Sequence, residues 1–368
     1  MAPAANLTVT AVNKLPLPRP GQTIELSAKQ IESLGVKDLN TVHVRDVADQ
    51  ELLCQAVDTD YDALHQPDIV IFQSDFAPRE TNTFTVSVGP KQVFTREQFK
   101  AFGRFVRERF DDFAWENDRI AHRTYGKELE TWIGEPLTSS SIDIWSKRTT
   151  RMVINDWYMA DQYHDDTGEG ADKYAAGVTR GCGGNGLWAG GKLWTSKNFV
   201  NSRTLANGPI RVMFALEYEA FDVNGRKVSE VKRITLDAGS NLSRFQSLYR
   251  PGAPGPLASG IGIRKTPGAA KTFNAKRGTL TVWEPMIENL GMQGIAVLVD
   301  PRLLERETED SLNYLVLARC GEDNAITYWA GFGWDKSGQF ANRAAWEKYV
   351  VEFAQGLASP IEVKVAAR

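Results

Sequence analysis

The sequence predicts a β-rich, all-β fold in which antiparallel strands predominate and helices are few and short. Three observations lead to this expectation: many short stretches alternate apolar with polar residues, turn signals separate them, and only two segments carry helical periodicity. No strand–helix–strand alternation is visible, and neither GxGxxG nor GxxxxGK[ST] occurs. A large antiparallel sandwich or another β-rich mixed fold is therefore expected, and a Rossmann or P-loop enzyme is not.

The clearest strand lies at residues 210–221, "IRVMFALEYEAF". Its alternate residues form one apolar face, made by Ile210, Val212, Phe214, Leu216 and Tyr218. The following Asn224-Gly225 pair is the strongest short hairpin signal in the chain. Two further strands, at 227–237 and 242–249, complete a predicted antiparallel unit of three. Other strands are expected at 81–89, 279–286, 294–300, 313–320 and 325–334.

Two segments predict helices. Residues 95–109 place Phe99, Phe102 and Val106 at helical spacing after a candidate N-cap, Thr95. Residues 342–358 place large apolar residues on one face, starting at an asparagine and stopping before Pro360.

The chain length of 368 residues accommodates two ordinary domains or one large β architecture. Residues 1–90 predict an N-terminal β region packed on a main body of residues 91–368, with a single domain overall as the alternative. Residues 111–209 form a loop-rich centre, which carries most of the unusual polar chemistry.

Composition excludes some classes of function. The formal net charge is −3, with 42% hydrophobic residues, so a nucleic-acid binder is not expected. No run of about 18 apolar residues occurs, so no helix is expected to span a membrane. Cys54, Cys182 and Cys320 lack metal-type spacing, and one disulfide among them is an open alternative. The small-residue start "APAAN" resembles a cleaved signal sequence, which favours a secreted or periplasmic protein over a cytoplasmic one.

Residues 111–126, "DDFAWENDRIAHRTYG", are dense in polar and aromatic side chains. If the segment is a strand from Glu116, then Glu116, Asp118, Ile120 and His122 share one face. Neither face is a normal apolar core face. The segment is either a salt-bridged edge strand or a wall that binds sugar or carboxylate groups.

Residues 163–184, "YHDDTGEGADKYAAGVTRGCGG", hold six glycines and predict a tightly turning loop whose backbone approaches a ligand closely. His164 with Asp165, Asp166 and Glu169 is chemically suited to a metal ion, although no metal motif is present. Two of these carboxylates are also suited to flank a glycosidic bond. A solvated acidic loop is the remaining alternative.

Two weaker patterns complete the survey. Asp58, Asp60 and Asp62 alternate like the start of a calcium loop, but the expected glycine and final acidic residue are missing, so a turn is expected. Glu284 stands in a strand where an apolar residue is typical, beside Trp283, and this favours a functional carboxylate.

Several long phrases resemble one protein family, among them "FVRERFDDFAWENDRIAHRTYG", "SSSIDIWSKRTTRMVINDWY", "YHDDTGEGADKYAAGVTRGCGG", "SKNFVNSRTLANGPIRVMF" and "VSEVKRITLDAGSNLSRF". The family is the domain of unknown function 4861, and the resemblance covers nearly the whole chain. It implies a β-supersandwich similar to that of galactose-mutarotase-like enzymes, and secreted proteins associated with the degradation of uronic-acid-containing polysaccharides. The mutarotase-like fold also implies a histidine–glutamate arrangement, here His164 and Glu284.

These residues predict a carbohydrate-active enzyme, a lyase that cleaves uronic-acid-containing glycans by β-elimination. That reaction needs a cation for the carboxylate, a base and an acid, which the arginines, histidines and tyrosines of the two polar segments supply. The expected catalytic residues are His164, Tyr174, His122, Arg123 and Glu284. The expected substrate-binding residues are Trp115, Glu116, Asp118, Arg119, Tyr125, Arg148, Asp165, Glu169, Lys173, Arg180 and Trp283. A glycoside hydrolase, a sugar epimerase and a non-catalytic carbohydrate-binding protein are the alternatives, and no cofactor or metal is expected.

Overall fold

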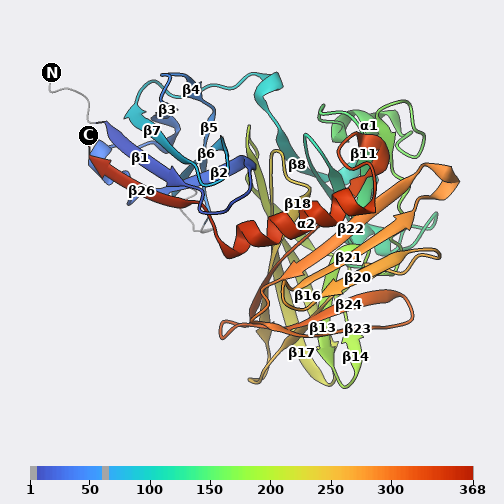
Figure 1. Ribbon diagram of the computed structural model, residues 1–368. Helices are drawn as coiled ribbons and strands as arrows, with labels where there is room; N and C mark the ends of the chain where they lie inside the picture. The colour runs from blue at the N-terminus through green and yellow to red at the C-terminus, as the bar shows by residue number, and fades with distance from the viewer. Residues whose placement is uncertain (1–5, 60–65, 368) are drawn as a thin grey trace.

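A computed structural model describes residues 6–59 and 66–367. The chain forms a small N-terminal β-sandwich and a larger β body, and helix α2 (Arg343–Ala358) runs beside both (Figure 1). The all-β prediction is confirmed, because antiparallel sheets make up both parts. Of the candidate calcium run, Asp60 and Asp62 lie outside the described residues.

The N-terminal sandwich packs a five-stranded sheet on a three-stranded one around a core that includes Val9, Val44 and Phe72. The five-stranded sheet has the order β26 (Glu362–Ala367), β1 (Leu7–Val12), β7 (Thr81–Val88), β3 (Val42–Arg45) and β4 (Glu51–Leu52). The three-stranded sheet has the order β2 (Arg19–Ser27), β6 (Ile69–Phe76) and β5 (Cys54–Val57). The last strand, β26, pairs antiparallel with the first, β1, so the C-terminal end of the chain returns to the N-terminal sandwich.

The largest sheet has eight antiparallel strands and contains the predicted hairpin unit. Asn224 and Gly225 both have positive φ, which allows the tight turn that the sequence predicts. The sheet order is β15 (Asn201–Ala206), β16 (Arg211–Val223), β17 (Arg226–Asp237), β18 (Leu242–Pro251), β25 (Ala325–Trp334), β22 (Met292–Val299), β21 (Thr279–Pro285) and β20 (Ala270–Asn274).

Two five-stranded sheets complete the larger body, and its core joins residues of all three sheets. One has the order β14 (Lys192–Trp194), β13 (Cys182–Ala189), β19 (Ala258–Arg264), β24 (Asn313–Arg319) and β23 (Leu304–Glu309). The other has the order β12 (Gly170–Ala171), β11 (Asp143–Lys147), β10 (Ala121–Thr124), β9 (Asp112–Asn117) and β8 (Ala101–Val106). Four of the predicted site residues lie in strands of this last sheet, namely Trp115 and Glu116 in β9 and His122 and Arg123 in β10.

The predicted C-terminal helix is confirmed, since α2 starts after Asn342, whose side chain accepts a hydrogen bond from the amide of Ala345. The helix predicted at 95–109 is wrong: strand β8 occupies its centre, between short 3-10 turns at Arg96–Gln98 and Arg107–Arg109. Strand β8 pairs antiparallel with β9 from Ala101 to Val106, and this pairing overrides the helical spacing of the apolar residues.

Shorter helical segments lie in the connections. Helix α1 (Ile154–Ala160) covers part of the sheet that contains β11, near the top of the larger body in Figure 1. The remaining 3-10 turns are Glu32–Leu34, Leu39–Thr41, Lys127–Glu130, Ile287–Asn289 and Asp335–Ser337. No helix among the described residues has the length and apolar character needed to cross a membrane. The three cysteines, all described, form no disulfide with one another.

Candidate active site

The predicted polar strand over residues 116–122 is a hairpin, so the expectation that its alternate residues share one face is wrong. Asn117 ends β9, and its side-chain oxygen accepts hydrogen bonds from the amides of Arg119 and Ile120 at 2.8 and 2.9 Å. This local side-chain bonding makes a turn, which asparagine favours over a continuous strand. The turn brings His122 opposite Trp115 on the neighbouring strand.

Trp115 and His122 belong to the interior. Their rings stack at 5.1 Å, and 0% and 1% of their surfaces are exposed. His122 Nδ1 lies 2.8 Å from the backbone carbonyl of Asp143, to which it donates, since a carbonyl only accepts. Burial lowers the pKa of His122 to about 4, so this histidine is neutral at physiological pH. The structure therefore places His122 in the packed core.

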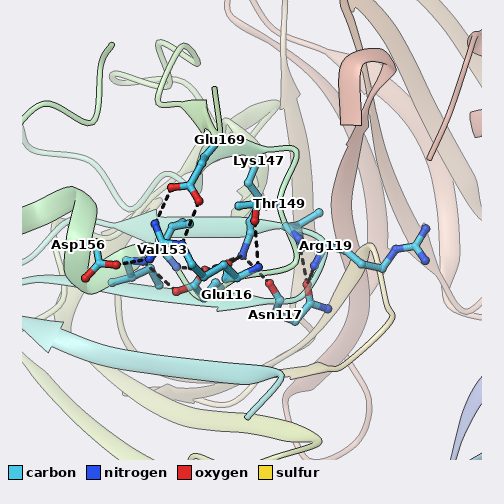
Figure 2. Close-up of polar contacts among 11 residues, drawn as sticks. Glu116, Asn117, Arg119, Lys147, Thr149, Val153, Asp156 and Glu169 are labelled. Carbon is cyan, nitrogen blue, oxygen red and sulfur yellow. Dashed lines mark hydrogen bonds and ion pairs between the residues drawn. The ribbon is translucent and has the colours of Figure 1, made fainter. Parts of the chain in front are cut away.

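Glu116 forms a buried ion pair with Lys147, whose ammonium lies 2.8 Å away, and neither side chain is exposed (Figure 2). The oxygen of Glu116 that faces Lys147 also accepts a hydrogen bond from the amide of Val153, and the other oxygen accepts one from the amide of Ile154, at the start of α1. The Lys147 ammonium also donates to the carbonyls of Asn117 and Arg151. Glu116 thus anchors the loop that leads into α1.

Glu169 connects this anchored loop to the glycine-rich segment. Its carboxylate accepts from the guanidinium of Arg151, with one bond of 2.9 Å, and Arg151 also pairs with Asp156 (Figure 2). The hydrogen bond from Arg151 lowers the pKa of Glu169 below its ordinary value.

Arg123 lies among three aspartates below the glycine-rich segment. Its guanidinium is 2.9 Å from Asp143, 2.9 Å from Asp172 and 3.7 Å from Asp112. Tyr125 donates from its hydroxyl to Asp143 at 2.9 Å. Each of the three aspartates keeps less than 5% of its surface exposed, and burial raises the pKa of both Asp112 and Asp172. One guanidinium does not neutralise three carboxylates, and burial favours the neutral form of Asp112 and Asp172.

The glycine-rich segment has the tight backbone that the sequence predicts. Gly170, in β12, has φ +119°, and a Cβ there would lie 2.0 Å from the carbonyl oxygen of Ser146. The amide of Asp172 donates to the carbonyl of Tyr163 at 2.7 Å, which closes the loop between them. Together these contacts position His164 above Asp172.

His164 is the accessible histidine of this region, with 61% of its side chain exposed. Its Nδ1 lies 3.1 Å from the backbone carbonyl of Asp172 and 3.8 Å from the carboxylate of the same residue. Because the carbonyl only accepts, Nδ1 carries the proton in this contact and Nε2 is the basic nitrogen. The ring of Tyr163 lies beside the imidazole at 4.5 Å.

Two cations border the same loop. Arg148 forms an ion pair with Asp166 and lies 4.7 Å above the ring of Trp334. Lys173 pairs with Glu288 at 2.7 Å. Asp165 is exposed, and its amide donates to the carbonyl of Gln162.

Glu284 lies on the inner face of the eight-stranded sheet and is fully buried. It accepts hydrogen bonds at one oxygen from Gln293, at 2.7 Å, and from Arg264, at 3.2 Å. Its second oxygen has no hydrogen-bond partner among the described residues. The Arg264 guanidinium lies 4.0 Å over the ring of Tyr174, whose pKa is raised, first by burial and then by Glu284. Tyr174 thereby connects the loop of His164 to Glu284.

Other predicted site residues lie elsewhere. Trp283 points to the opposite face of its strand and packs near Trp346 of α2. Asp118 accepts from the amide of Gly239, and the Arg119 side chain donates to Asn241. Arg180 is buried between the sheets, where burial lowers its pKa to about 10.

Arg180 belongs to a buried polar group that the sequence interpretation missed. Glu230 and Lys232 lie inside the sandwich, with their charged atoms 3.6 Å apart and side-chain exposures of 1% and 0%. The sequence carries a signal for them. In β17, Glu230 and Lys232 continue the series of every second residue that includes Val228 and Ile234, so both charged side chains lie on the apolar face of the strand. Burial lowers the pKa of Lys232.

The geometry does not indicate a metal centre. Among residues 6–59 and 66–367, no three His, Cys, Asp or Glu side chains converge in an arrangement suited to a metal ion.

The comparison with known proteins decides the family. Residues 12–363 match the family described as a domain of unknown function, DUF4861. The chain belongs to this family. It is 33% identical over 372 residues to "Uncharacterized protein P7" of Formosa agariphila, covering 97% of this DUF4861 chain and 93% of that protein.

Solved structures resemble the DUF4861 chain in fold alone. A glycosyl hydrolase family 38 protein from Enterococcus faecalis matches 100% of this chain with a TM-score of 0.54 and 12% identity. An alpha-mannosidase from the same species matches 99% with a TM-score of 0.51 and 11% identity. The chain spans about half the length of both, covering 48% and 46% of them.

Proposed function

We propose that this protein is a carbohydrate-active enzyme, a lyase that cleaves uronic-acid-containing glycans by β-elimination. The observation that carries the proposal is the geometry of His164. A backbone carbonyl holds its Nδ1, and the exposed imidazole presents Nε2 as a base, on a loop bordered by Arg148 and Lys173.

Each step of the elimination has a residue assigned to it. Arg148 and Lys173 neutralise the uronate carboxylate, exchanging their present partners Asp166 and Glu288 for the substrate. His164 Nε2 takes the proton from the carbon next to that carboxylate, and the electron pair forms a carbon–carbon double bond as the glycosidic carbon–oxygen bond breaks. Tyr174 supplies the proton to the leaving oxygen from its hydroxyl, the donor group of a tyrosine side chain. Its hydroxyl is buried, so this role requires the loop 172–180 to shift when substrate binds.

The carbohydrate class rests on two kinds of support. The resemblance of the sequence to its family implies an association with polysaccharide degradation, and the two solved structures of similar fold are named as a glycosyl hydrolase family 38 protein and an alpha-mannosidase. Fold likeness alone does not fix an activity, so the reaction is argued from the site.

A glycoside hydrolase is the second candidate, and one observation favours it. The buried carboxyl of Asp172, beneath His164, has a raised pKa and is suited to act as a general acid. Glu284 is the matching carboxylate, with one oxygen that lacks a partner among the described residues.

The test incubates the protein with a panel of uronate oligosaccharides and records the ultraviolet absorbance of the unsaturated product. We expect His164→Ala to lower the rate by about 10²-fold or more, the usual contribution of a general base. Gln162→Ala, an exposed change two residues away, is the matched control and should retain the wild-type rate. New reducing ends without this absorbance would support the hydrolase, and binding without turnover would support a non-catalytic protein. Full activity of the alanine variant would refute the assignment of His164.

A further inference from the structure

A cavity of about 660 Å³ lies between the N-terminal sandwich and the outer face of the eight-stranded sheet. It is lined by residues 17–25, by β17, β18 and β25, and by the C-terminal half of α2, which Figure 1 shows beside the N-terminal sandwich. None of the residues around His164 lines it. Its volume is within the range of about 300–1,000 Å³ that is common for small-molecule sites. We call this cavity the interdomain groove.

The floor of the groove places a cation beside an aromatic ring. Arg244 of β18 is the cross-strand partner of Thr235 on one side and of Trp329 on the other, so the three side chains share one face. That face is the outer one, because the neighbouring residues Ser243 and Phe245 are buried on the inner side. Trp329 is half-buried and lines the groove together with Arg244.

The charge of Arg244 is not balanced by a direct partner. Its guanidinium makes no hydrogen bond or ion pair with the residues that the structure describes, whereas Arg211 nearby is paired with both Glu25 and Asp237. Among the residues with a described position, Arg119 at the side of the groove bonds to the neutral amides of Asn241 and Gln339 and to no carboxylate. Arg244 and Arg119 therefore line the groove without a carboxylate partner among the described residues, as does Arg19, which donates to Gln22 and to the carbonyls of Gly356 and Ser359.

We propose that the interdomain groove binds an acidic saccharide, with Arg244 holding a uronate carboxylate and Trp329 stacking on the sugar ring. A planar guanidinium matches a carboxylate with two parallel hydrogen bonds, and an indole face matches the apolar face of a sugar. Arg119 binds the carboxylate of a second uronate unit in the same oligosaccharide. The choice of uronate rests on the proposed function, but the site is separate from His164 and does not require that residue to be catalytic.

The experiment measures binding by calorimetry, with tetragalacturonate as the probe and its methyl ester as the neutral control. His164→Ala serves as the background, so that the probe is not consumed. Arg244→Met and Trp329→Ala are compared with Arg250→Met, an exposed arginine on the same strand and the same side that does not line the groove. We expect both groove variants to weaken binding by about tenfold or more, with Arg250→Met unchanged. We also expect the methyl ester to bind more weakly than the acid.

Equal affinity of Arg244→Met and the background protein would overturn the proposal, as would an absence of binding to the background protein. Analytical ultracentrifugation of the same variants tests whether a second copy of the chain occupies the groove. If the protein is a dimer and Arg244→Met dissociates it, the groove is a dimer interface and the proposal of a saccharide site is overturned. The lyase assay is independent. Groove binding without turnover in the wild-type protein would refute the proposed function alone, and turnover without groove binding would refute this inference alone.

Discussion

Lys147 and Glu116 form an ion pair whose two side chains have no exposed surface, with 2.8 Å between ammonium and carboxylate. Both charged groups also bond to the backbone. The Lys147 ammonium donates to the carbonyls of Asn117 and Arg151. The Glu116 carboxylate accepts from the amides of Val153 and Ile154. The pair therefore fixes the path of the chain between β11 and α1, above which the candidate active site is built.

Lys147→Met should destabilise the protein strongly, because it leaves the carboxylate of Glu116 buried without its cation. The expected loss in the free energy of unfolding is about 3–5 kcal/mol, measured by urea denaturation at pH 7. The double change Glu116→Gln with Lys147→Met removes both charges and should recover part of that loss. Lys348→Met is the control: its pair with Glu352 is a surface pair worth about 1 kcal/mol or less. A similar loss for both lysine variants would contradict the prediction.

Asp112 should make stability fall as pH rises. Burial raises its pKa in the folded protein from 3.8 to about 7, so the folded chain holds a proton that the unfolded chain releases in this range. The stabilisation from this group is complete below pH 3.8 and is lost as pH rises to about 7. Each pH unit in that window changes the free energy of unfolding by at most about 1.4 kcal/mol.

Asp112→Asn should remove this contribution, so the free energy of unfolding should decline less steeply between pH 5 and 7 than in the wild-type protein. His122 acts in the opposite direction, since its pKa is lowered from 6.5 to about 4 and its contribution is lost as pH falls through that range. Urea denaturation at several pH values measures both slopes. Identical slopes for the variant and the wild-type protein would show that Asp112 does not hold the proton.

The sequence predicted the regular strands and the C-terminal helix because local pattern and tertiary packing agree there. The hairpin at Asn224 and the N-cap at Asn342 are examples in which one residue decides the local structure. The segment at 95–109 failed because Phe99, Phe102 and Val106 match a helical period, while pairing of β8 with β9 selects a strand. Spacing alone does not reveal which neighbour a segment will meet.

The candidate site was predictable in part. The glycines of the segment 163–184 indicated a close-packed loop, and the positive φ and close contact of Gly170 agree with that interpretation. The sequence did not reveal that His122 is buried on Trp115 whereas His164 is exposed above Asp172. Both outcomes depend on which strands pair, and so on contacts between residues distant in the chain.

Gly170→Ala should impair both folding and activity, and Gly168→Ala provides its matched control. Both glycines have positive φ, at +119° and +107°, which costs about 1–3 kcal/mol for another residue. A Cβ at position 170 would also meet the carbonyl oxygen of Ser146 at 2.0 Å, whereas none of the described atoms lies within 4 Å at position 168. We expect a larger loss of stability and of turnover for Gly170→Ala, measured by thermal unfolding and by the lyase assay. Equal effects would show that the contact with β11 does not position His164.

Glu284→Gln distinguishes the two candidate reactions. In the lyase, Glu284 acts through Arg264, which lies over Tyr174, so the neutral amide should reduce kcat by about tenfold or less. In the hydrolase, Glu284 is a reacting carboxylate, and its loss should reduce kcat by about 10³-fold or more, because covalent or general-base chemistry then stops. Glu305→Gln, an exposed change on β23, controls for loss of charge, and thermal unfolding confirms that each variant is folded. Two results together would show that the protein is a hydrolase. The folded Glu284→Gln variant would lose kcat about 10³-fold, and the wild-type protein would release saturated sugars with new reducing ends.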